Sequence, residues 1–349
     1  MIKKIVLILL ISVFCFSCKE NIGRSFDDFG IVELLDVTDS IHLEKYGILN
    51  PHYIYYKDSF LIFNSMRGGK EIHFLDLTTQ SVHELSVIGQ GKNEMVHYWT
   101  VQNVNSCCYE FADTQRGHVY GVNLDSLRQN PATRHELLYS LPIDDGNHFF
   151  RFLETEKYVV GVGILHEGRF GLYEKKTCSY VEQMGYPVNE NIDKLDNKYK
   201  GALFSRTLLS SDMQGKKIVS GCFGLLDFYS ISDHGEFLLI KSNYYHFPLF
   251  EANPVGGGAI AYKKEDIVGI TGLISDEKYV YVLYSDKTFE NDGERAYNAS
   301  HLLVFDWRGM PVIHYRLSKE LYGFALCGNI LYGLSRDKEP IVYSYKMNL

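Results

Sequence analysis

The chain has 349 residues, with 43 acidic and 35 basic side chains and a formal net charge of −8 at pH 7. This charge argues against nucleic acid as a partner, since a phosphate backbone needs a basic surface. Length alone suggests two domains, although all-β folds of this size often form one unit. Tyrosine is unusually frequent, at 26 residues, and clusters with Phe, Val and Ile in short alternating runs, which favours strands over helices.

Residues 1–17 are predicted to be a secretory signal peptide. Lys3 and Lys4 precede a mostly apolar run over residues 5–16, which is too short to cross a bilayer of about 30 Å as a stable helix. The Ser17-Cys18 pair that follows resembles the lipobox of bacterial lipoproteins, so Cys18 is the expected lipid attachment site and membrane anchor. A plain cleaved signal with an incidental cysteine is the alternative. Cleavage removes the two lysines and so lowers the net charge from −8 to −10.

The remainder is expected to comprise a lipidated tether over residues 18–29 and a single domain over residues 30–349. Five cysteines follow Cys18, and they show neither the paired CxxC spacing of a metal site nor an even disulfide framework. Most are expected to be buried as small apolar residues. We therefore predict no metal site in this domain.

Six similar units recur along the domain. Their central apolar runs begin at Ser59, Cys107, Lys157, Lys217, Lys278 and Asn329, so neighbouring starts are 48 to 61 residues apart. Each run is preceded by another across a tight polar turn and followed by a third, and five units supply a fourth. The last unit stops at Leu349 without its fourth run. Ile31–Val37, IVELLDV, has no neighbouring run with which to form a hairpin and is the candidate to complete that unit.

This count predicts an all-β fold: a six-bladed β-propeller with four-stranded antiparallel blades. The N-terminal strand is expected to pair with the last blade and close the ring, which removes exposed sheet edges. A pair of β-sandwiches or a β-helix is the alternative. A period near 50 residues is too long for a β-helix coil, however, and a sandwich does not require six similar units.

The lipobox, six units of this length, strands ending in FxF/D patterns and the loop Ile88–Met95, IGQGKNEM, together resemble the TolB-like six-bladed propeller lipoproteins of Bacteroides and relatives. The loop in that group often reads GxGPGEF, whereas Lys92-Asn93 and Met95 replace Pro-Gly and Phe here. The resemblance implies the fold and an outer membrane lipoprotein that faces the periplasm or the cell surface. It implies no reaction.

Two shorter patterns resemble features of the same group. Lys19-Glu20, directly after the lipid cysteine, resembles part of the acidic tag that sends some lipoproteins to the outer face of the membrane. Asp39-Ser40-Ile41 and Asp125-Ser126-Leu127 resemble Asp-Ser/Thr-apolar sites of protein O-glycosylation, which leaves Ser40 and Ser126 as candidates for modification.

Recognised catalytic signatures are absent from the sequence. It contains no GxSxG, no Walker loop and no HExxH, and its 13 histidines are scattered without ligand spacing. We therefore predict no catalytic residues and no cofactor.

The loops between second and third strands, and those between blades, should gather at one end of the central channel. Arg67, Arg116 and Arg336 recur near the first of these junctions. If they converge, they form a cationic patch suited to carboxylate, phosphate or a sulfated sugar. The alternative is that each pairs with a nearby acid.

The loops between blades supply further candidates for ligand binding. Residues 86–99 combine glycines with Lys92, Glu94, His97, Tyr98 and Trp99. Residues 185–205 and 246–266 are long loops, and the second holds Tyr262, while residues 286–300 are polar and expected to be exposed. Aromatic faces beside polar groups suit sugar rings or peptide backbones, although they also suit packing of the loops themselves.

Two functions remain open at this stage. The first is a lipid-anchored binding or scaffold module that recognises a peptide, protein or glycan at the loop-rich face of the channel. The second is a propeller enzyme, a glycan lyase or hydrolase, whose residues come from several blades. Two carboxylates, or a His/Tyr pair, within reach at the channel end would favour the enzyme.

Overall fold

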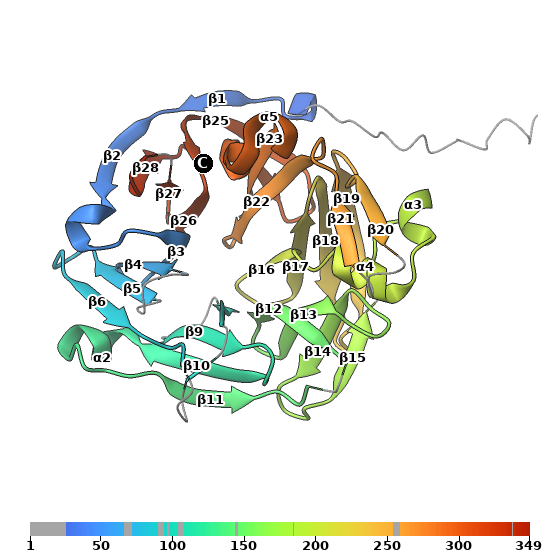
Figure 1. Cartoon of the computed structure of the whole chain (residues 1–349), viewed down its shortest axis with the longest axis horizontal. Helices are drawn as coiled ribbons and strands as arrows, with labels where there is room; N and C mark the ends of the chain where they lie inside the picture. The colour runs from blue at the N-terminus through green and yellow to red at the C-terminus, as the bar shows by residue number, and fades with distance from the viewer. Residues whose placement is uncertain are drawn as a thin grey trace, which may run out of the picture.

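The computed structural model describes residues 26–65, 72–89, 94–95, 98–103, 108–143, 146–183, 185–253, 259–336 and 338–349. Six four-stranded antiparallel sheets surround a central channel, and each sheet forms one blade (Figure 1). The prediction of a six-bladed propeller is confirmed. Among the described residues, no helix is long and apolar enough to span a membrane.

The first three blades follow one another in chain order, each running from the channel outward. Blade 1 contains β3 (Pro51–Lys57), β4 (Phe60–Ser65), β5 (Ile72–Asp76) and β6 (Val82–Leu85). Blade 2 contains β7 (Trp99–Thr100), β9 (Cys108–Asp113), β10 (His118–Asn123) and β11 (Glu136–Ser140). Blade 3 contains β12 (His148–Glu154), β13 (Tyr158–Ile164), β14 (Phe170–Glu174) and β15 (Tyr180–Gln183), and β8 (Gln102–Asn103) joins β12 in parallel.

The last three blades complete the ring. Blade 4 contains β16 (Leu208–Ser211), β17 (Lys217–Cys222), β18 (Leu225–Ile231) and β19 (Phe237–Tyr244). Blade 5 contains β22 (Ile267–Ser275), β23 (Tyr279–Thr288), β24 (Ala299–Asp306) and β25 (Pro311–Leu321). Blade 6 contains β26 (Gly323–Cys327), β27 (Ile330–Ser335), β28 (Ile341–Lys346) and β2 (Val37–His42).

An N-terminal strand closes the ring, as predicted, but the segment differs from the one expected. β2 pairs with β28 in antiparallel register from Val37 opposite Tyr345 to His42 opposite Ile341. The expected segment Ile31–Val37 forms β1 (Val32–Leu35) instead, which adds to the outer edge of blade 5 in parallel with β25. Both stretches are short extended runs, so their sequence did not show which would meet the last blade. The packing of Leu35 distinguishes β1 from β2, because Leu35 lies in the apolar cluster between blades 5 and 6.

The segment expected to be a tether already contacts the propeller at its C-terminal end. Phe26 lies in the 3₁₀ helix η2 (Phe26–Asp28), and its ring is 5.1 Å from those of Tyr284 and His314, centroid to centroid. Phe29 is 3% exposed and packs against Phe305. Phe26 and Phe29, which the sequence analysis assigned to the tether, therefore pack on the propeller.

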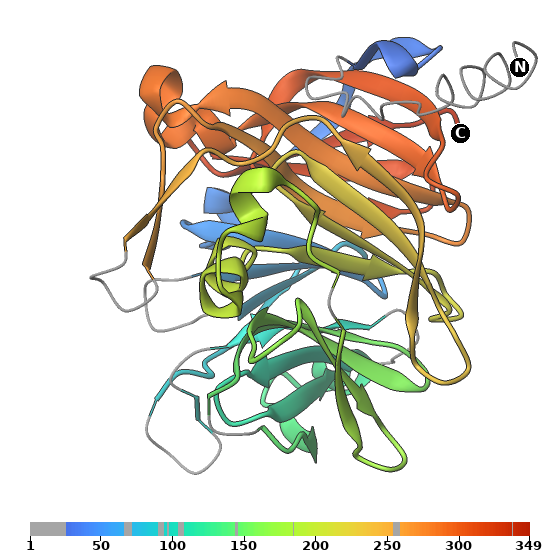
Figure 2. The same cartoon turned by 90° about the vertical axis from the view of Figure 1, so that its right-hand side faces the viewer.

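Short helices and one hairpin occupy the long connections. The helices are η3 (Leu43–Tyr46), α2 (Leu124–Gln129), α3 (Glu190–Asp193), α4 (Asn197–Leu203), α5 (Phe289–Asp292) and η4 (Gly293–Tyr297), and the hairpin pairs β20 (Phe250–Asn253) with β21 (Ala259–Tyr262). Seen from the side, α5 and the hairpin lie on the same side of the ring (Figure 2). The polar segment 286–300, expected to be an exposed loop, thus contains two helical turns.

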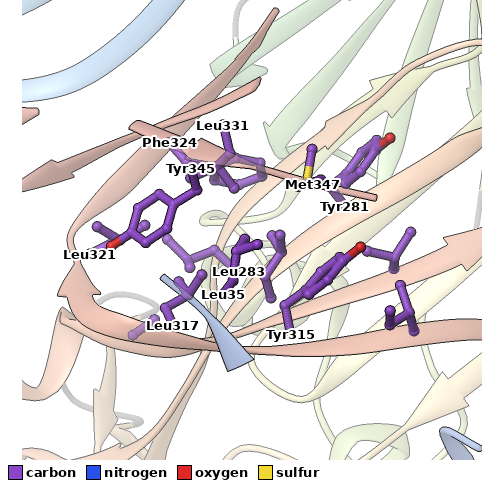
Figure 3. Close-up of a cluster of buried hydrophobic side chains, with 14 residues drawn as sticks. Leu35, Tyr281, Leu283, Tyr315, Leu317, Leu321, Phe324, Leu331, Tyr345 and Met347 are labelled. Atoms are coloured by element: carbon purple, nitrogen blue, oxygen red, sulfur yellow. The ribbon is translucent and has the colours of Figure 1, made fainter. Parts of the chain in front are cut away.

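Neighbouring blades are joined by apolar side chains that lie between their sheets. Figure 3 shows the cluster between blades 5 and 6, whose members include Leu35, Leu283, Leu317 and Leu331. Burying a side chain of this size contributes about 1.5–3 kcal/mol. Since β1, blade 5 and blade 6 all contribute to this cluster, closure of the ring is stabilised by packing as well as by the β2–β28 ladder.

Candidate functional site

A cavity of about 870 Å³ opens at one end of the central channel, which we call the channel mouth. Its walls are residues of the innermost strands, including most of β22, together with Cys222 at the end of β17 and the loops beside them. Nine Phe, Tyr and Trp rings line it: Tyr53, Tyr55, Trp99, Phe223, Tyr262, Phe289, Tyr297, Tyr322 and Phe324. The expectation that loops of several blades meet at one end of the channel is therefore realised as a hollow lined with rings.

Backbone geometry brings blade 4 close to blade 5 at this cavity. Gly269 has a φ of 75°, and a Cβ at this position would lie 2.2 Å from the carbonyl oxygen of Phe223. The N–H of Ile270 donates to that same oxygen over 2.7 Å. Phe223 itself has a φ of 54°, a left-handed conformation that costs a bulky residue about 1–2 kcal/mol. Such strain is often found at binding sites, and here it places the Phe223 ring 5.3 Å from that of Tyr262.

Arg151 forms the first of three arginine–aromatic groups around the mouth. It lies at a bulge in β12, where the pairing with β13 shifts between Phe149 and Arg151. Its guanidinium carbon is 4.9 Å from the centre of the Trp99 ring and 5.9 Å from that of Tyr53. Cation–π contacts of this kind hold a guanidinium beside a ring without neutralising its charge.

Arg206 forms the second group, directly before β16. Its guanidinium carbon lies 5.0 Å from the centre of the Tyr262 ring, and its Nη1 donates to Tyr297 Oη over 2.9 Å. The Tyr262 hydroxyl donates to the Leu203 carbonyl at the end of α4 over 3.1 Å, which fixes the ring. Burial raises the pKa of Tyr262 to about 12, so the ring stays neutral beside the cation.

Arg336 forms the third group, at the end of β27. Its guanidinium carbon is 4.5 Å from the centre of the Tyr322 ring. Its Nη1 lies 3.3 Å from His52 Nδ1, and because arginine can only donate, the neutral His52 ring carries its proton on Nε2 in this contact. Burial raises the pKa of Tyr322. Arg336 thus stands behind two residues that line the cavity, His52 and Tyr322.

One buried carboxyl group lies in the cavity wall. Asp266 is 7% exposed, and its Oδ1 is 3.8 Å from Nδ1 of His246. Burial raises the pKa of Asp266 to about 7, although hydrogen bonds from the N–H groups of Leu249 and Ile267 oppose the rise. Burial also lowers the pKa of His246 to about 4, so this imidazole is neutral at pH 7. At that pH the carboxyl group is close to half protonated.

The structure distributes the sequence-predicted residues among three environments. Trp99 and Tyr262 line the cavity, and Arg336 lies directly behind it. Arg116 is not among the lining residues; it is half-exposed, its Nε lies 3.7 Å from Asp113 Oδ2, and its Nη1 donates to the carbonyl of Glu94. Arg116 therefore pairs with a nearby acid, which was the alternative to a cationic patch in the sequence analysis.

Two residues of loop 86–99 lie outside the cavity wall, and others lie outside the described residues. Tyr98 is 8% exposed and packs on Phe111 within the core between blades 1 and 2, and the side chain of Glu94 is exposed. The remaining predictions fall on residues outside the described part of the chain: Cys18, Arg67, Lys92 and His97. The glycosylation candidates Ser40 in β2 and Ser126 in α2 are both exposed.

Sequence reasoning missed Arg151 and Arg206, two of the three arginines at the mouth. Arg151 is a charged residue inside the apolar run FFRFLE, which becomes an innermost strand, and Arg206 directly precedes the run TLLSS, which becomes another. A cation at the start or inside of an innermost strand faces the channel, and this was the available signal.

The side chains at the mouth indicate which kinds of ligand it can bind. Among the described residues, no group of three or more His, Cys, Asp or Glu side chains is placed to hold a metal ion. Three stacked guanidinium groups and nine rings provide planar apolar surfaces beside positive charge. Such a surface recognises ligands that combine apolar faces with anionic groups.

Fold and cavity together define a class of protein: a closed six-bladed β-propeller with a hollow, aromatic channel mouth. The chain belongs to the TolB-like 6-blade propeller-like family, whose sequence profile matches residues 32–328. The TolB-like part of the sequence resemblance is thereby confirmed. No curated protein sequence matches the chain. Among solved structures, it is similar to a chain of Kuenenia stuttgartiensis hydrazine synthase, at 11% identity and a TM-score of 0.45 over 86% of this chain and 96% of that chain.

Proposed function

We propose that this protein is a lipid-anchored binding module of the bacterial cell envelope, with its ligand held in the cavity at the channel mouth. The observation that carries the proposal is the cavity of about 870 Å³, lined by nine rings and bordered by stacked arginines. A hollow of this size matches the clefts in which proteins enclose small or oligomeric ligands. Rigid blades hold its walls, so little ordering entropy is lost on binding.

The binding test uses the chain without residues 1–17 and with Cys18→Ser, screened by calorimetry against glycans and peptides. Trp99→Ala and Tyr262→Ala should each weaken the binding of any ligand found by about tenfold or more, as expected when a buried aromatic contact is lost. Arg308→Ala is the matched control, because Arg308 is 81% exposed on the turn between β24 and β25. A ligand whose affinity neither aromatic substitution changes would place the binding site elsewhere.

The enzyme remains a second candidate because a His/Tyr pair borders the mouth. The ring centroids of His52 and Tyr322 are 6.4 Å apart, and Arg336 contacts both. In this function His52 would exchange a proton with a bound glycan, and Arg336 would stabilise developing negative charge. Mass spectrometry of each bound glycan after incubation decides between the two. Cleavage that His52→Ala abolishes while binding persists would establish the enzyme.

Anchoring is tested separately in the full-length chain. Replacing Cys18 by Ser should move the protein from the membrane fraction to the soluble fraction, since two or more acyl chains are needed for durable attachment. The matched control is Cys15→Ser, which changes the other cysteine of the same segment and should leave the protein on the membrane. Retention of the Cys18→Ser variant in the membrane fraction would reject the lipid anchor.

A further inference from the structure

The described arginines differ in the partners that they contact. Outside the mouth, five described arginines form ion pairs with carboxylates: Arg116, Arg128, Arg169, Arg295 and Arg308. At the mouth, Arg151, Arg206 and Arg336 stack on rings instead, and no carboxylate of the described residues pairs with them. Two further described arginines, Arg134 and Arg316, form no ion pair with a described carboxylate either, but no described ring lies against them, so the mouth arginines are distinguished by stacking without an ion pair.

Stacking leaves the hydrogen-bonding edge of each guanidinium available for a further partner. The group has five N–H donors in its plane, whereas a ring contacts only its face. Arg206 uses one donor on Tyr297 Oη. Because the ring also fixes the direction of the group, less side-chain entropy is lost when an anion binds to that edge. The mouth arginines are therefore oriented for a planar anion such as a carboxylate.

The three groups stand at different points around the mouth. Arg151 comes from blade 3 and stacks on blade 2, Arg206 lies between blades 4 and 5, and Arg336 comes from blade 6. A ligand with several anionic groups can contact more than one of them. Two exposed lysines follow Tyr262 in the same wall: Lys263, which pairs with Glu251 over 3.7 Å, and Lys264.

We propose that the cavity binds an acidic oligosaccharide, with sugar rings against Trp99 and Tyr262 and carboxylate groups at Arg151 and Arg206. This inference rests on the proposed binding function and specifies its ligand class. A sugar ring presents a flat C–H face and carries its carboxylate at the ring edge. That arrangement matches an aromatic plane with a guanidinium stacked on it. Side chains of an acidic peptide supply the charge without the rigid flat face.

The arginines also select against neutral sugars of the same shape. A neutral ring in the cavity would shield the guanidinium groups from water without giving them a charged partner, and such loss of hydration is costly. A site built for a hydrogen-bonding group discriminates strongly against an analogue that lacks the group. Acidic sugars should consequently bind at least tenfold more tightly than their neutral forms, a factor equal to about 1.4 kcal/mol.

Calorimetry with matched ligands tests the inference. The panel contains trisaccharides of galacturonate, glucuronate and mannuronate, the same trisaccharides with each carboxylate reduced to an alcohol, and a triglutamate peptide. We expect at least one uronate trisaccharide to bind, and its reduced form to bind at least tenfold more weakly. Arg151→Met and Arg206→Met should each weaken binding of the acidic form about tenfold and leave the reduced form nearly unchanged. Arg308→Met is the control.

The outcomes separate this inference from the proposed function. If only reduced sugars or the peptide bind, and Trp99→Ala abolishes that binding, the acidic oligosaccharide is rejected while a binding module at the mouth stands. Equal affinity for acidic and reduced forms also rejects it. If no uronate binds and the wider ligand screen yields nothing sensitive to Trp99→Ala, both proposals fail. Melting temperatures of the variants, which should match that of the parent protein, exclude misfolding as the cause of lost binding.

Discussion

Two regions of the propeller use arginine in opposite ways. In the seam between blades 3 and 4, Arg169 is 1% exposed and its Nη1 lies 3.0 Å from Asp227 Oδ2 and 3.0 Å from the Gly185 carbonyl. At the channel mouth, Arg151 and Arg206 lie on aromatic rings, and no carboxylate of the described residues pairs with them. Arg169 also lies over Phe170 and Phe204, so stacking is common to both regions. The two regions differ in that only the seam supplies a carboxylate partner, Asp227.

This difference separates an arginine that holds blades together from one that can receive a ligand. A buried charge requires a fixed partner, because its desolvation is costly. An arginine near solvent does not need one, so its charge can serve an incoming anion. The presence of an arginine therefore does not indicate its role. Whether it pairs with a carboxylate or only stacks on a ring indicates whether that part of the propeller is structural or suited to recognition.

The largest expected effect comes from breaking the seam. Arg169→Met leaves Asp227 buried without its cation, and we expect a loss of about 3–5 kcal/mol in the free energy of unfolding. Urea denaturation of the single variant measures this loss. The double variant Arg169→Met/Asp227→Leu should lose less than the sum of the single variants, since it removes both charges. A loss below about 1 kcal/mol in Arg169→Met would mean that the seam is no more structural than a surface pair.

A smaller effect is expected at Asp266, the buried carboxyl group of the mouth. Its raised pKa, about 7, means that the folded state favours the neutral form, so its contribution to stability is lost as pH rises toward and through 7. Asp266→Asn keeps the shape and the acceptor oxygen but not the charge. We expect the variant to unfold at about the same temperature as the parent protein at pH 4, and to be more stable by about 3–4 kcal/mol at pH 8.

The groups around Asp266 define the control for that experiment. His246 faces it across 3.8 Å and is neutral at the upper end of this range, because its pKa is lowered to about 4. Glu265 repels its negative charge, and Tyr262 and Tyr284 have raised pKa values. Repeating the pH series with Glu265→Gln separates the neighbouring charge from burial. A stability difference between Asp266→Asn and the parent protein that does not grow from pH 4 to pH 8 would contradict the assignment of the pH effect to Asp266.

The smallest expected effect on stability is at the mouth arginines. Arg151→Met and Arg206→Met should change the free energy of unfolding by less than about 1 kcal/mol, because each loses a cation–π contact but leaves no buried charge unpaired. Urea denaturation measured beside Arg169→Met makes the comparison direct. A loss of several kcal/mol at either position would show that the mouth arginines are structural and would remove the contrast with the seam.

The propeller was predictable because its signal is repeated. Each unit carries the same alternation of apolar runs and polar turns, so an error in one unit does not alter the count. The strand that closes the ring was harder to predict, since Ile31–Val37 and the Val37–His42 segment are both short extended runs. Only packing places Leu35 beside Tyr315 and pairs Val37 with Tyr345. In the candidate site, Trp99 and Tyr262 were found as aromatic residues in loops, but Arg151 lies in a strand and gave no loop signal.

The sequence by itself determined the number of blades, the strand type and the presence of aromatic residues at one end of the channel. These follow from local alternation and turn chemistry, which depend on near neighbours in the chain. Tertiary structure alone decided which strand closes the ring and which arginines meet which rings. Arg151 stacks on Trp99, more than 50 residues earlier in the chain, and Arg206 bonds to Tyr297, 91 residues later. Such pairs form only when distant blades are brought together around one axis.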